Sequence, residues 1–106
     1  MTAQDTQQAY LAGLMEFIKA SPTPFHAVSS MVDALTAAGY CRLTVADTWA
    51  LEAGGRYFIS RNDSTIIAFV LPKKQGLQRL HMVGAHTDSP CLKVKPNPEV
   101  KRKGYQ

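Results

Sequence analysis

The sequence predicts an α/β fold made of two amphipathic helices, a β-hairpin and a further apolar strand. Three observations favour this class. Two segments near the amino terminus carry apolar residues at helical spacing. An alternating segment, a polar turn and an apolar segment follow one another, as in a hairpin. Residues 80–85 then form a nearly continuous apolar run that ends at a histidine, as a strand buried on both faces does.

The first helix is expected over residues 6–20. Its apolar residues recur every three or four positions and form one stripe, made of Tyr10, Leu11, Leu14, Met15, Phe17 and Ile18. Pro22 lies just beyond and cannot continue a helix. We expect the stripe to pack against a sheet as part of the core.

The second helix is expected to begin at Pro24, with Thr23 as its N-cap, and to end at Gly39. Its apolar stripe comprises Phe25, Val28, Val32 and Leu35. His26 falls in the first turn, where a neutral imidazole either lies near an active cleft or caps and packs against the helix. Both interpretations of His26 stay open on the sequence.

A short strand is expected within residues 39–43, followed by an irregular connection over residues 46–55. Trp49 lies in this connection, and we expect it to anchor the segment by burying its large ring. The hairpin follows: residues 56–61 alternate, Asn62 and Asp63 mark a turn, and residues 64–71 form the second strand. Residues 72–78 are polar and lead to the apolar strand before His86.

His86 and Asp88 stand at the end of that apolar strand, where open α/β sheets place their ligand sites. Residues two apart on an extended backbone face the same side. A neutral imidazole binds zinc, and a carboxylate beside it accepts the other ring proton or positions water. The alternative is a surface histidine in a turn, with Asp88 or Ser89 capping the next element.

Three segments together resemble the aspartyl aminopeptidase family of zinc exopeptidases. Residues 86–90, His-Thr-Asp-Ser-Pro, resemble the first metal motif of that family, with matching flanks at 83–85 and 93–98. Residues 21–27, Ser-Pro-Thr-Pro-Phe-His-Ala, resemble its amino-terminal motif, and residues 54–58 with 61–69 resemble its first hairpin. The three matches occur in the family's order and span most of residues 21–98.

The resemblance implies that His86 is a zinc ligand and Asp88 the catalytic carboxylate that accompanies it. It implies an α/β/α sandwich, two zinc ions per active site and a homo-oligomer. The implied reaction is removal of amino-terminal Asp or Glu residues from peptide substrates by metal-assisted attack of water. Residues from about 91 to 106 are then expected to lead towards an inserted second domain.

The metal site is incomplete within this sequence, because Glu99 is the only carboxylate after Asp88 and no histidine follows. A catalytic zinc normally has three protein ligands. The chain is therefore expected to be the amino-terminal, incomplete part of a catalytic domain, and to be inactive alone.

Composition narrows the remaining classes. Cys41 and Cys91 show no Cys-x-x-Cys spacing, which favours free thiols in a reducing compartment. No apolar stretch approaches the roughly 20 residues of a membrane span, and the amino terminus lacks the pattern of a secretory signal, so a cytoplasmic setting and no membrane partner are expected. The net charge of +4 would suit an anionic partner. Basic residues gather near the carboxyl end, without a nucleic-acid motif, at Lys93, Lys95, Lys101, Arg102 and Lys103. We therefore expect no nucleic-acid partner. The alternative to the peptidase is a non-catalytic α/β interaction module that uses this basic end.

Overall fold

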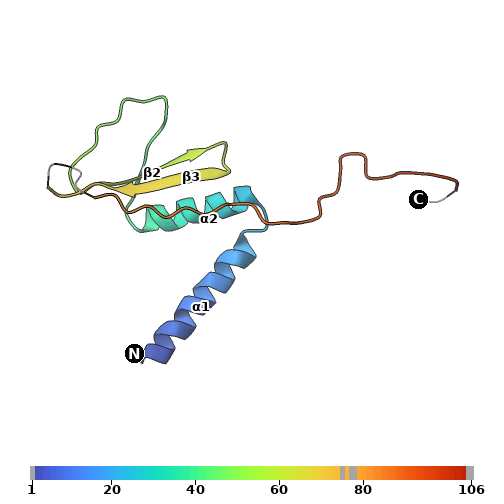
Figure 1. Cartoon of the computed structure of the whole chain (residues 1–106), viewed down its shortest axis with the longest axis horizontal. Coiled ribbons are helices and arrows are strands. Elements are labelled where there is room, and N and C mark those ends of the chain that lie inside the picture. The colour runs from blue at the N-terminus through green and yellow to red at the C-terminus, as the bar shows by residue number, and fades with distance from the viewer. Residues whose placement is uncertain (1, 75, 77–78, 105–106) are drawn as a thin grey trace.

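The computed structural model describes residues 2–74, 76 and 79–104. Two helices, α1 (Ala3–Ala20) and α2 (Pro24–Ala37), precede three strands, β1 (Cys41–Arg42), β2 (Arg56–Arg61) and β3 (Thr65–Val70). The strands form one sheet in the order β1-β2-β3, in which β1 runs parallel and β3 antiparallel to β2. Helix α2 lies along the sheet, whereas α1 points away from it (Figure 1). The predicted α/β class is confirmed.

Helix α1 begins three residues earlier than the spacing of apolar residues indicates, because its start is fixed by a capping box. The Thr2 hydroxyl accepts a hydrogen bond from the Asp5 amide at 3.2 Å, and the Asp5 carboxylate accepts one from the Thr2 amide at 2.9 Å. None of its residues is buried, and Tyr10 is 77% exposed. The expectation that the α1 stripe packs against the sheet is therefore wrong for the described chain.

Helix α2 begins where the sequence predicts. The Thr23 hydroxyl accepts from the His26 amide at 3.3 Å, and Pro24 occupies the first turn. The helix ends at Ala37, and Gly39 follows with a left-handed φ of 80°. The buried apolar residues of the described chain come from α2 and β2: Ala27, Val28, Tyr57 and Phe58.

The hairpin forms as predicted, with Arg61 paired to Thr65 and Arg56 to Val70. Asn62 and Asp63 both adopt left-handed backbone angles, with φ of 51° and 50°, and the Ser64 amide donates to the Arg61 carbonyl at 3.2 Å. Such angles at both central positions match the right-handed twist of the flanking strands.

The connection between β1 and β2 is irregular, as predicted, but Trp49 is only partly buried. Its side chain is 39% exposed, and its indole N–H donates to the Thr44 carbonyl at 2.8 Å. Trp49 therefore stabilises the loop through a local hydrogen bond rather than through burial in the core.

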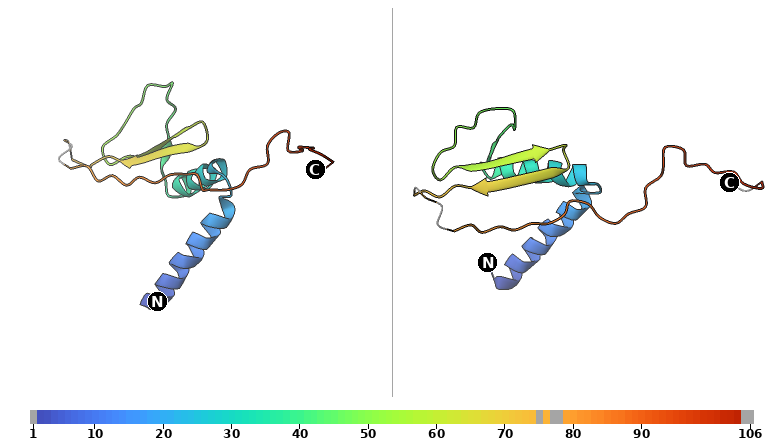
Figure 2. Two further views of the ribbon diagram at one scale, coloured as in Figure 1. Left: turned by 45° about the vertical axis from the view of Figure 1, so that its right-hand side comes forward. Right: turned by 45° about the horizontal axis from the view of Figure 1, so that its top comes forward.

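The strand predicted over residues 80–85 is also wrong for the described chain. The segment runs back beside the sheet and α2 without joining the ladder (Figures 1 and 2), and Met82 and Val83 are 80% and 99% exposed. A strand buried on both faces needs partner strands and covering layers, which the described residues do not supply. The radius of gyration accordingly is 19.9 Å, against about 13 Å for a compact domain of this length.

Candidate metal centre

His86 and Asp88 converge in the structure, as their spacing predicts. The His86 Nδ1 atom lies 3.1 Å from Asp88 Oδ1 and 2.6 Å from the Asp88 carbonyl oxygen. Both side chains are open to solvent, at 78% and 77% exposure. The convergence is therefore local, because it is set by the backbone of three consecutive residues.

This contact determines which ring nitrogen of His86 is available to a metal. Both neighbours of Nδ1 are oxygen acceptors, so we assign the ring proton of the neutral imidazole to Nδ1. The Nε2 atom then carries the lone pair, and no hydrogen bond to it is found among the described residues. A carboxylate that accepts the second ring proton both orients an imidazole and makes it a better ligand.

Thr87, between the two predicted site residues, has a contact of its own. Its hydroxyl donates to the Ser64 carbonyl at 2.8 Å, and its side chain is half-buried. Thr87 is not among the predicted site residues. The sequence carries no signal for this contact, because its partner lies 23 residues earlier in the hairpin turn.

The donors present fit zinc in kind but are too few to complete a site. An imidazole nitrogen and a carboxylate are both ordinary zinc ligands or ligand partners. Within residues 2–74, 76 and 79–104, no group of three His, Cys, Asp or Glu side chains is placed to hold an ion. A catalytic zinc at His86 therefore needs ligands in addition to those described.

Among the described residues, His26, Cys41 and Cys91 do not join His86 in a group of three side chains that could hold an ion. The His26 Nδ1 atom lies 2.7 Å from the Thr23 hydroxyl, so the imidazole takes part in the cap of α2. Cys41 and Cys91 are both free and exposed, which confirms the expectation of free thiols. The contact that the structure shows at the predicted metal site is the one between His86 and Asp88.

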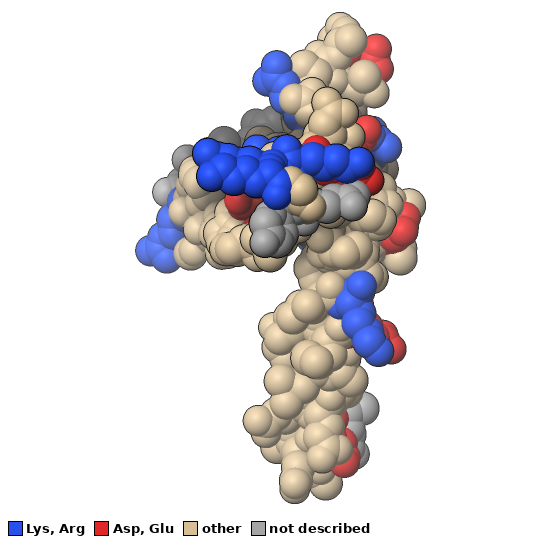
Figure 3. Space-filling model, turned by 90° about the vertical axis from the view of Figure 1, so that its right-hand side faces the viewer, with Lys and Arg blue, Asp and Glu red and all other residues tan. Residues whose placement is uncertain are grey.

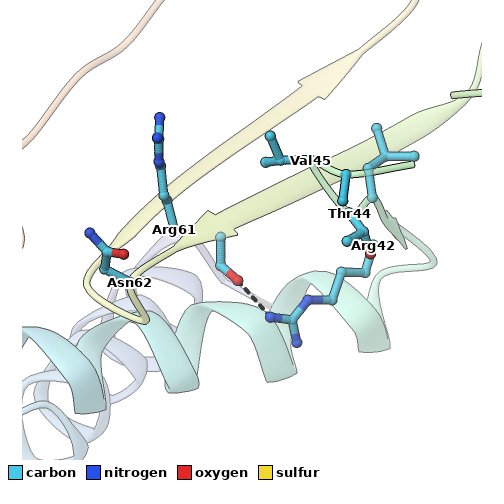
Figure 4. Close-up of a pocket in the computed structure, with 8 residues that line it drawn as sticks. Arg42, Thr44, Val45, Arg61 and Asn62 are labelled. Atoms are coloured by element: carbon cyan, nitrogen blue, oxygen red, sulfur yellow. Dashed lines mark hydrogen bonds between the residues drawn. The ribbon is translucent and has the colours of Figure 1, made fainter. Parts of the chain in front are cut away.

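A pocket of about 410 Å³ lies beside β1 and β2 (Figure 4). Arg42 extends towards the helix side of β2, where it donates to the Ser60 hydroxyl at 2.6 Å, whereas Arg61 points away from it. The two guanidinium groups do not converge on one point, and His86 and Asp88 are not in the lining. This pocket therefore adds nothing to the candidate metal centre.

The basic residues near the carboxyl end gather on one end of the molecule (Figure 3). Lys93, Lys95 and the run 101–103 are all exposed. In the part of the chain that the structure describes, no carboxylate lies within ion-pair distance of them. Neither described helix has the length and apolarity needed to cross a membrane.

Comparison with known proteins assigns this sequence to a family. Residues 17–106 match the model of the aminopeptidase I zinc metalloproteases, M18. The "Probable M18 family aminopeptidase 2" of Pseudomonas putida KT2440 is 58% identical over 100 residues, which cover 93% of this chain and 23% of that protein. Its namesake in Pseudomonas aeruginosa UCBPP-PA14 is 57% identical over 94 residues, covering 88% and 22%.

Two solved structures share the fold. A chain in the cryo-EM structure of the Ape4 and Nbr1 complex superposes with a TM-score of 0.64 and 37% identity, covering 65% of this chain and 14% of that one. The structure of Chaetomium thermophilum mApe1 gives a TM-score of 0.58 and 38% identity, covering 59% and 15%. This chain thus spans less than a quarter of the relatives it matches. By the family model and by its relatives, the chain belongs to the M18 family of zinc metalloprotease aminopeptidases.

Proposed function

We propose that this chain is the amino-terminal part of a zinc-dependent aminopeptidase, with His86 as a metal ligand and Asp88 as the catalytic carboxylate. The observation that carries the proposal is the contact of His86 Nδ1 with Asp88, which leaves Nε2 to bind an ion. Membership of the M18 family supports the reaction class. The coverage of 23% of a relative supports a longer protein that supplies the missing ligands.

The roles of the two side chains follow from their chemistry. When bound, zinc supplies Lewis acidity that polarises the scissile carbonyl and activates water. His86 holds the ion through Nε2, and Asp88 keeps the ring proton on Nδ1 and fixes the plane of the ring. We propose two ions per site, which requires further carboxylate and histidine ligands and a general base from the rest of the protein.

The substrates we propose are peptides with amino-terminal Asp or Glu residues, and the protein we propose is a cytoplasmic homo-oligomer. The acidic preference rests on the resemblance of the three motifs to aspartyl aminopeptidases. The exposed apolar stripe of α1 supports burial against another surface in the full-length protein. Initial rates on Asp-, Glu- and Leu-anilides, with sedimentation of the same sample, test both parts.

The decisive experiment compares His86→Ala and Asp88→Asn in the full-length protein. His86→Ala should lower zinc content, measured by elemental mass spectrometry, because the ligand is removed. Asp88→Asn should preserve the fold but sharply lower turnover, because an amide does not hold the ring proton as a carboxylate does.

Matched controls are available for both changes. His81→Ala and Asp47→Asn alter exposed residues outside the motif, and neither side chain makes a hydrogen bond among the described residues. Both should behave as wild type. Unchanged zinc content in His86→Ala would reject the ligand assignment, and wild-type turnover in Asp88→Asn would reject the catalytic role.

One observation favours a second candidate, a non-catalytic interaction module. The exposed basic residues at the carboxyl end have no described carboxylate partners, so they offer a charged surface to an acidic protein. A full-length protein that lacks both zinc and peptidase activity, and that binds an acidic partner in a salt-dependent way, would favour the module. Activity that depends on zinc would favour the peptidase.

A further inference from the structure

The hydrogen bond from Thr87 to Ser64 is the contact that ties the histidine motif to the folded part of the chain. It joins residues 23 positions apart. No other hydrogen bond between residues 79–104 and the helices or the sheet is found in the described chain. Residues on both sides of Thr87 are exposed, whereas Thr87 itself is half-buried.

Thr87 lies at a bend of the chain, between the two predicted site residues. Its hydroxyl is held 2.8 Å from the Ser64 carbonyl of the hairpin turn. The side chains of His86 and Asp88, on either side of the bend, meet at 3.1 Å. A rotation of the segment that released Thr87 would also turn both predicted site residues.

The acceptor stands on a rigid part of the molecule. Ser64 follows the two left-handed residues of the hairpin turn, and its amide is bonded to the Arg61 carbonyl. The next residue, Thr65, is already paired with Arg61 in the ladder. The Ser64 carbonyl is therefore fixed by the hairpin, and β2 in turn carries the buried Phe58.

We propose that Thr87 is a positioning residue of the metal centre. Its hydroxyl docks the motif onto the end of the β2–β3 hairpin and so sets the direction of His86 and Asp88. This inference rests on the proposed function, in which His86 binds the metal. It gives the hairpin turn, which lies outside the histidine motif, a role in positioning the metal ligand.

The test compares Thr87→Val, which keeps the shape and removes the hydroxyl, with Thr87→Ser, which keeps the hydroxyl. Loss of partners that orient a ligand lowers metal affinity about 10- to 100-fold. Because Thr87 acts on His86 through the backbone, we expect about a 10-fold loss for Thr87→Val. Competition of the full-length protein with a zinc chelator measures the loss, and Thr87→Ser should restore most of the affinity.

Thr65→Val is the matched control. It makes the same chemical change one residue from the acceptor, at an exposed hydroxyl that has no hydrogen bond among the described residues. It should leave zinc affinity unchanged. Thr87→Ala repeats the loss of the hydroxyl with a smaller side chain, and its agreement with Thr87→Val excludes an effect of valine itself.

A second readout does not depend on the metal. In the metal-free full-length protein, amide hydrogen exchange over residues 84–90 should be faster in Thr87→Val than in wild type or Thr65→Val. Equal exchange would overturn the docking, and wild-type zinc affinity in Thr87→Val would overturn the positioning role. If His86→Ala keeps its zinc, the proposed function fails, while the exchange experiment still decides the docking.

Discussion

Gly55 lies where a side chain has no room, and its replacement by alanine should destabilise the fold. A Cβ atom at Gly55 would stand 2.5 Å from Tyr57 Oη and Cε2 and 2.7 Å from Cζ. Tyr57 is only 7% exposed, packs against Phe69 with ring centroids 5.7 Å apart, and accepts a hydrogen bond from the Glu52 amide at 2.9 Å. The Tyr57 ring therefore has to shift, which disturbs both its packing on Phe69 and its hydrogen bond from Glu52.

The cost follows from these contacts. Forcing extra atoms into a packed site costs about 1–3 kcal/mol. Loss of the Tyr57–Glu52 hydrogen bond adds about 1 kcal/mol. Gly55→Ala should therefore lower the free energy of unfolding by about 2–4 kcal/mol, of which the larger part is steric.

Gly13→Ala is the matched control, because it makes the same change with the opposite expected sign. Gly13 lies in α1, and a Cβ there meets nothing within 4 Å. Alanine in an exposed helix is favoured over glycine by about 0.5–1 kcal/mol. A change from glycine to alanine should thus stabilise α1 at position 13 and destabilise the β1–β2 region at position 55.

The assay is urea unfolding of the 106-residue chain followed by the fluorescence of Trp49, its only tryptophan, with far-UV circular dichroism for α1. The fluorescence midpoint should fall in Gly55→Ala, and helicity should rise in Gly13→Ala. A Gly55→Ala chain with wild-type or higher stability would refute the steric argument, since it would show that Tyr57 moves without cost.

Three further predictions concern the core, the turn and the amino-terminal cap. Phe58→Ala should lower the free energy of unfolding by about 3–5 kcal/mol, because Phe58 is 1% exposed. Ile67→Ala, at a residue that is 60% exposed, should lower it far less in the same urea titration. Equal losses would contradict the assigned core. Asp63→Gly should raise stability by about 0.5–1 kcal/mol, because glycine adopts the φ of 50° without a Cβ penalty, and a lower urea midpoint would count against it. Hydrogen bonds from the Thr2 backbone amide and side chain lower the pKa of Asp5 below its ordinary value of 3.8. A carboxyl group with a lowered pKa stabilises the folded form at pH values above 3.8, and this stabilisation is lost as the pH falls through the pKa of the folded state. The helicity of α1 should therefore drop on acidification in wild type but not in Asp5→Asn.

The site was predictable to the extent that it is local. His86 and Asp88 are two residues apart on either side of a bend at Thr87, so local backbone geometry brings them together, and the structure places their side chains 3.1 Å apart. The role of Thr87 depends on a hairpin 23 residues earlier. Nothing in residues 86–88 specifies that partner, because the contact exists only once the chain has folded back.

The sequence by itself determined the helices and the hairpin, because caps and turns are decided by interactions within about four residues. Thr23 as N-cap and Pro24 in the first turn fix the start of α2, and Asn62 and Asp63 form the turn of the hairpin. Only the tertiary structure decided that the α1 stripe lies exposed, that Trp49 keeps part of its ring in solvent, and that residues 80–85 stay outside the ladder. Those outcomes depend on partners distant in sequence, since burial and strand pairing need surfaces that a local pattern cannot supply.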